Sequence, residues 1–69
     1  MTVIDLREVN KATRHVRRLS KQLEYALVQR DVSAAYRHAE GMEHAAFEAK
    51  RILVSGGKYE PETEPEPER

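Results

Sequence analysis

Three side chains with metal-ligand chemistry recur at helical spacing in the second half of the chain: Glu40, His44 and Glu48. Steps of four place them on one side of an α-helix, because a helix turns once every ~3.6 residues. One helix alone would supply only part of the coordination shell of a divalent cation. The sequence also has no paired base and nucleophile and no loop that forms a pocket. We therefore expect no enzyme activity, no metal site and no cofactor.

A row of basic side chains in the first half has a spacing that suits anion binding. Its members follow one another at steps of three and four: Arg7, Lys11, Arg14, Arg18, Lys21 and Tyr25. Such a row can lie along a phosphate backbone, with the tyrosine available for stacking. A solvated helix face is the simpler interpretation, and the net charge of zero favours it. Nucleic-acid binding is therefore the alternative function rather than the leading one.

A third set, in the second half, has the character of a protein-binding surface. Tyr36, Phe47 and Val54 share one outer face of the helix expected there, away from its alanine-rich side. Aromatic residues are enriched in the cores of protein interfaces. We expect these three residues to contact a partner protein or a second copy of the chain.

Two apolar runs predict the elements that position these residues. Steps of three and four keep each run on one side of a helix. The first run is Val9, Ala12, Val16, Leu19, Leu23 and Ala26; the second is Val32, Ala35, Ala39, Met42, Ala46, Ala49 and Leu53. The runs are out of phase, because continuing the first would place Arg30 and Ser33 on its apolar side.

The phase break predicts an antiparallel, coiled-coil-like hairpin over residues 1–54, with helices at about 5–30 and 32–54. Asp31 and Ser33 offer side-chain oxygens that can cap the start of the second helix. The turn contains neither Gly nor Pro, so one continuous helix is the competing structure.

Residues 55–69 form a different kind of segment. Ser55, Gly56 and Gly57 end the second helix, and a Pro- and Glu-rich sequence follows. This segment has five Glu against Lys58 and Arg69, a balance of −3. It cannot build a core, and we expect it to be a flexible acidic tail.

The chain is short enough to need help in folding. A core made by 69 residues rarely supplies more than about 3–5 kcal/mol, and the absence of Cys excludes disulfides. We therefore expect self-association, as a homodimer that forms a helical bundle. No apolar run approaches the ~20 residues of a membrane span, and no signal sequence is recognisable. We expect no membrane partner and a cytoplasmic location.

The segment 29–40 resembles the turn and second helix of a tetratricopeptide unit, with Asp31 at the turn and spaced alanines after it. The first-helix signature is missing, and one hairpin is fewer than the roughly three repeats that such solenoids need. The chain is therefore not assigned to that family. We expect a small interaction module, an adaptor, regulator or assembly protein, whose Ala/Arg/Glu-rich composition suits a bacterial or phage genome.

Overall fold

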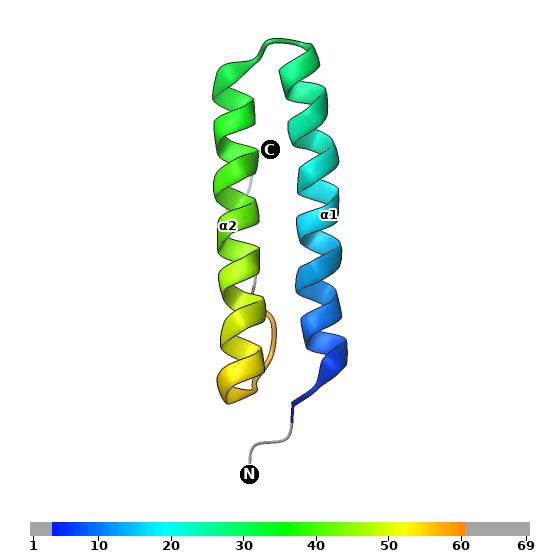
Figure 1. Cartoon of the computed structure of the whole chain (residues 1–69), viewed down its shortest axis with the longest axis vertical. Helices are drawn as coiled ribbons and strands as arrows, with labels where there is room; N and C mark the ends of the chain where they lie inside the picture. The colour runs from blue at the N-terminus through cyan, green and yellow to red at the C-terminus, as the bar shows by residue number, and fades with distance from the viewer. Residues whose placement is uncertain (1–3, 61–69) are drawn as a thin grey trace, which may run out of the picture.

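The computed structural model describes residues 4–60, which form two antiparallel helices joined by a short turn (Figure 1). Helix α1 spans Leu6–Val28 and helix α2 spans Val32–Ser55. The all-α hairpin expected from the phase break is confirmed, and one continuous helix is excluded. Neither helix in the described part of the chain is long and apolar enough to cross a membrane.

Both helices begin at an aspartate. The Asp5 side chain accepts a hydrogen bond from the backbone N–H of Arg7 at 3.0 Å, and the Asp31 side chain accepts one from Ala34 at 3.1 Å. Each bond satisfies one of the amide groups that have no partner within the first turn of a helix. Asp31 is therefore the cap of α2, as the sequence predicted.

The turn closes without glycine because Arg30 takes the left-handed conformation, with φ of 59°. The N–H of Asp31 donates to the carbonyl of Ala26 at 2.8 Å, and the N–H of Arg30 donates to Leu27 at 3.1 Å. This pair of bonds is the Schellman motif, in which glycine usually occupies the left-handed position. Sequence analysis found no Gly or Pro here because an arginine fills that position.

Small side chains form the contact between α1 and α2. The buried apolar residues are four alanines and one isoleucine: Ala12, Ala26, Ala35, Ala45 and Ile52. A Cβ atom added to Gly41 would lie 2.9 Å from Cδ1 of Leu19, so the helices meet closely there. Helices approach each other in this way only where their facing side chains are small.

The face that α2 turns toward α1 differs from the expected one. Of the predicted contact row, Ala35 is buried and Met42 and Ala49 are half-buried, but Val32, Ala39, Ala46 and Leu53 are exposed, Val32 by 76% and Leu53 by 50%. The residues that face α1 are instead Ala45 and Ile52 together with Gly41. Successive residues of a helix differ by ~100° around its axis, so the expected and observed rows differ by a rotation of α2 about its own axis of about a quarter of a turn. The observed row sets Gly41 against Leu19, and the missing Cβ lets the two helices approach closely there.

The left-handed Arg30 generates a stability prediction. A side chain in this conformation costs roughly 1 kcal/mol, so we expect Arg30→Gly to raise the free energy of unfolding by about 0.5–1 kcal/mol. Gln29 has an ordinary right-handed φ of −79°, so Gln29→Gly is the matched control and lowers stability instead. Thermal unfolding followed by circular dichroism measures both. Equal effects of the two substitutions, or a loss of stability in Arg30→Gly, would contradict the assignment.

Candidate interaction surfaces

The chain turns back on itself after α2. The N–H of Gly56 donates to the carbonyl of Ile52 at 2.7 Å, and Gly56 and Gly57 have φ of 76° and 108°. These are conformations that glycine adopts at low cost. Residues 58–60 then lie along one side of the hairpin (Figure 1). We call this side, where the C-terminal segment contacts both helices, the strapped side.

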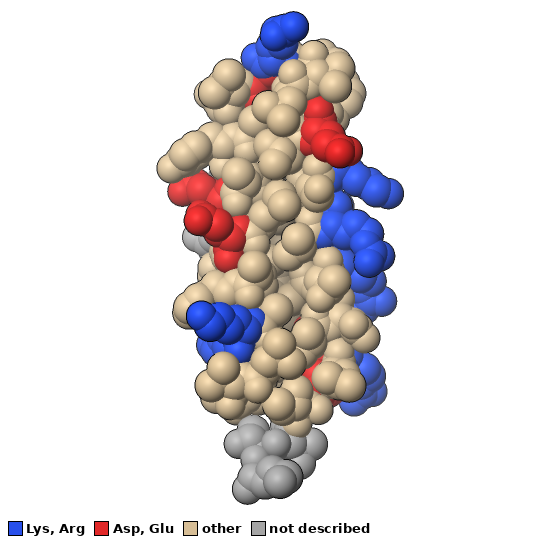
Figure 2. All heavy atoms as spheres, in the orientation of Figure 1, with Lys and Arg blue, Asp and Glu red and all other residues tan. Residues whose placement is uncertain are grey.

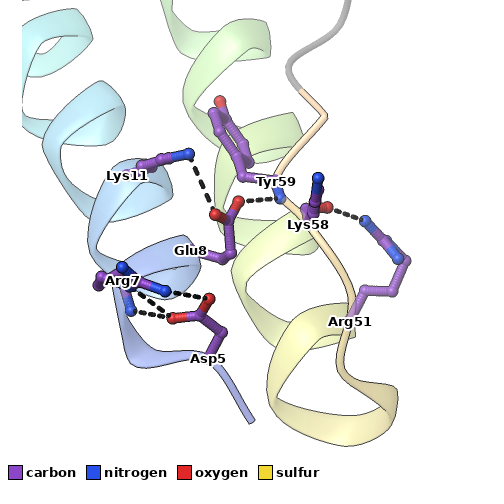
Figure 3. A network of polar contacts seen from close by, with 7 residues as sticks. All are labelled: Asp5, Arg7, Glu8, Lys11, Arg51, Lys58 and Tyr59. Atoms are coloured by element: carbon purple, nitrogen blue, oxygen red, sulfur yellow. Dashed lines mark hydrogen bonds and ion pairs between the residues drawn. The ribbon is translucent and has the colours of Figure 1, made fainter.

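Glu8 links the C-terminal segment to α1. One carboxylate oxygen accepts the backbone N–H of Tyr59 at 2.8 Å, and the other accepts Nζ of Lys11 at 3.0 Å (Figure 3). The residue is only 8% exposed. The Tyr59 amide first, and then Lys11, hold the pKa of the Glu8 carboxyl below its usual value. A buried carboxylate with two donors therefore secures the segment in its charged form.

Arg51 links the same segment to α2. Its guanidinium donates to Glu48 at 2.7 Å and to the backbone carbonyl of Lys58 at 2.9 Å. The hydrogen bond from Arg51 lowers the pKa of Glu48. Residues 58–60, which the sequence placed in the flexible tail, thus contact both helices. Residues 61–69 lie outside the described part of the chain, and their flexibility stays a prediction.

A tyrosine that sequence analysis did not select lies beside the basic row. The hydroxyl of Tyr59 is hydrogen-bonded to Nδ1 of His15, with the ring centroids 6.0 Å apart. Burial raises the pKa of Tyr59. The tyrosine and members of the basic row line a shallow groove on the strapped side: Lys11, Arg14, His15, Arg18 and Tyr59. The contact spans 44 residues of sequence, so no local pattern could have indicated it.

The structure divides the predicted anion-binding row. Arg7 is paired with Asp5 at 3.3 Å, and Lys11 is paired with Glu8. Arg14, Arg18 and Lys21 are exposed and form no ion pair with another residue of the described part. Tyr25, 67% exposed, lies in a different hollow near the turn. The groove therefore combines three of the five predicted cations with Tyr59 in place of Tyr25.

The predicted protein-binding residues are all exposed on α2. Tyr36 is 64%, Phe47 61% and Val54 75% exposed. They lie 11 and 7 residues apart, which is about 16 and 10 Å along a helix. Nothing in the described chain covers them, but their spacing makes them separate contact points on one outer face rather than one continuous patch.

A further surface is the side of the hairpin opposite the strapped side, which we call the open face. Figure 2 views it, and few charged side chains interrupt its centre. On α1, helical spacing places on this face Val9, Thr13, Val16, Ser20, Leu23 and Leu27. On α2 it places Ala39, Met42, Ala46, Ala49 and Leu53, most of the row that was expected to face α1.

The possible metal ligands of α2 do not form a cluster. Glu48 is bonded to Arg51, and in residues 4–60 no three His, Asp or Glu side chains are grouped as a metal ion would need. Comparison with models of protein families, with curated proteins and with solved structures gave no match for this chain. The function must therefore be argued from the surfaces themselves.

The Glu8 contact predicts a pH dependence. The pKa of the Glu8 carboxyl is lower in the folded state than its ordinary value of about 4.5, which we take for the unfolded chain. The stability that the ionised carboxyl contributes is therefore fully present above about pH 4.5, and it is lost as the pH falls through the folded pKa. We expect Glu8→Gln to reduce the loss of stability between about pH 7 and pH 3, measured by urea unfolding. Glu24→Gln, at an exposed position of α1, is the control. The same pH dependence in both variants would show that the contact contributes nothing.

Proposed function

We propose that the protein is a non-enzymatic protein–protein interaction module: an adaptor, regulator or assembly protein that works in the cytoplasm of a bacterial or phage-infected cell. The observation that supports this is the open face, whose centre has few charged side chains (Figure 2) and on which helical spacing places mainly apolar residues of both helices. Contiguous apolar surfaces of this kind on small proteins are typical of interaction sites.

Self-association is the first use that we propose for the open face. The described hairpin is a single layer of two helices, and stable domains usually bury their apolar surface between two layers. A second hairpin placed on the open face would complete a coiled-coil-like bundle of four helices. Tyr36, Phe47 and Val54, on the outer face of α2, would remain available for a different protein partner.

Ala46→Glu tests this proposal. Ala46 is exposed in the single hairpin, so the substitution leaves each hairpin folded but buries an unpaired charge on association. We expect at least a tenfold rise in the dimer dissociation constant, measured by sedimentation equilibrium, with helicity at high concentration unchanged.

The control for this experiment is Gln22→Glu, which adds the same charge to an exposed position away from the open face. It should leave association unchanged. If the unaltered chain sediments as a folded monomer at micromolar concentration, self-association through the open face is wrong.

Nucleic-acid binding is a second candidate function, and the groove on the strapped side favours it. Arg14, Arg18 and Lys11 line this groove with Tyr59, and cations with an aromatic ring suit a phosphate backbone and its bases. The balance of charge argues against strong binding, because the whole chain has a net charge of zero.

Titration with duplex DNA at several salt concentrations separates the two functions. Binding through phosphates weakens steeply with salt, because counterions are released, whereas association through an apolar face is far less sensitive. Our leading proposal predicts no appreciable DNA binding at about 0.15 M salt. Tight binding there that Arg14→Ala and Arg18→Ala weaken, while Arg37→Ala does not, would favour the second function.

A further inference from the structure

Helix α2 has two apolar rows, and one neighbour cannot cover both. The first row, with Ala45 and Ile52, is buried against α1. The second, about a quarter of a turn away, includes Ala39 and Ala46, which stay exposed, as does half of Leu53. An apolar arc this wide is typical of a helix that packs against neighbours on two sides. The second row therefore needs a further helix.

We propose that this helix is α1 of a second copy, so that the two hairpins stack by their open faces with each α1 on the partner's α2. The inference rests on the proposed function and adds the orientation of the copies. The two-fold axis then runs parallel to the helices, and every helix has antiparallel neighbours, as in an up-and-down four-helix bundle.

The sizes of the side chains support this orientation. The open face of α1 has mainly large residues, among them Val16, Leu23 and Leu27, whereas that of α2 is mainly alanine. Stacking α1 on α1 would set large side chains against large ones, and stacking α2 on α2 would set alanine against alanine. The mixed arrangement avoids setting the large residues of α1 against one another and the alanines of α2 against one another.

The charges along the edges of the open face support the same orientation. Helical spacing places Arg17 on the outer edge of the open face on α1 and Glu43 on its outer edge on α2. Figure 2 shows Lys and Arg side chains gathered along the α1 edge. The mixed arrangement brings Arg17 of one copy to the edge that carries Glu43 of the other, and this charge complementarity favours that pairing.

The position of each residue along the helix axis, which we call its level, makes the pairing specific. Gly41 lies opposite Leu19, and antiparallel helices rise equally per residue. Glu43 therefore lies level with Arg17, and Ala46 lies level with residue 14, next to Thr13. A two-fold axis parallel to the helices rotates a residue without moving it along the helix axis. Thr13 of one copy would therefore meet Ala46 of the other.

Disulfide trapping between single-cysteine chains tests the arrangement, since the natural chain has no Cys. Thr13→Cys and Ala46→Cys chains, one of them isotope-labelled, are mixed and mildly oxidised, and mixed disulfides are measured by mass spectrometry. We expect at least tenfold more mixed disulfide in this pair than in the control pair of Thr13→Cys with Ser20→Cys. The control pair would be trapped if α1 lay on α1.

The possible failures are distinguishable. Preferential trapping of Thr13→Cys with Ser20→Cys in a dimer would overturn the orientation and leave self-association intact. A folded monomer in sedimentation, with neither pair trapped, would overturn both the orientation and the self-association on which it rests.

Discussion

Alanine, glycine, one isoleucine and Leu19 supply the contact between α1 and α2, and the other surfaces follow from that contact. Because the facing side chains are small, the helices approach closely at Gly41 and Leu19. Apart from Leu19 and Ile52, most of the larger apolar side chains then lie beside the contact line instead of within it. Leu27, Leu53 and Phe47 are all at least half exposed. A hairpin built in this way leaves several large apolar side chains exposed.

The two sides of the hairpin are consequently unlike each other. On the strapped side, Glu8 and Arg51 bind the backbone of residues 58 and 59, and His15 contacts Tyr59. Charged groups and a returning chain therefore occupy that side, which disfavours the docking of an apolar helix. The open face lacks such groups along its centre. This asymmetry is the basis of our proposal that a helical partner docks on the open face, with the outer face of α2 as a separate surface.

The sequence was sufficient to predict the two-helix architecture, but it did not predict which side of α2 faces α1. The phase break and Asp31 located the turn, because capping and periodicity are local properties of the chain. The apolar arc of α2 is wide enough to contain two rows, and periodicity alone cannot say which row faces α1. The choice depends on the fit of Gly41 and Ala45 against α1, which is a tertiary property. Tyr59 was missed for a similar reason, since its partners Glu8 and His15 are more than 40 residues away.

The central claim is that the row of α2 left uncovered by α1 is covered by another copy of the chain. Isotope-filtered nuclear Overhauser spectroscopy on a mixture of labelled and unlabelled chains tests it most directly. The methyl group of Met42 is the best probe, because it lies in the middle of the open face. Our account predicts intermolecular contacts from this methyl group to Val16 or Leu23 methyl groups of a different chain. Strong intramolecular contacts without any intermolecular ones, at a concentration where the chain is fully helical, would contradict it.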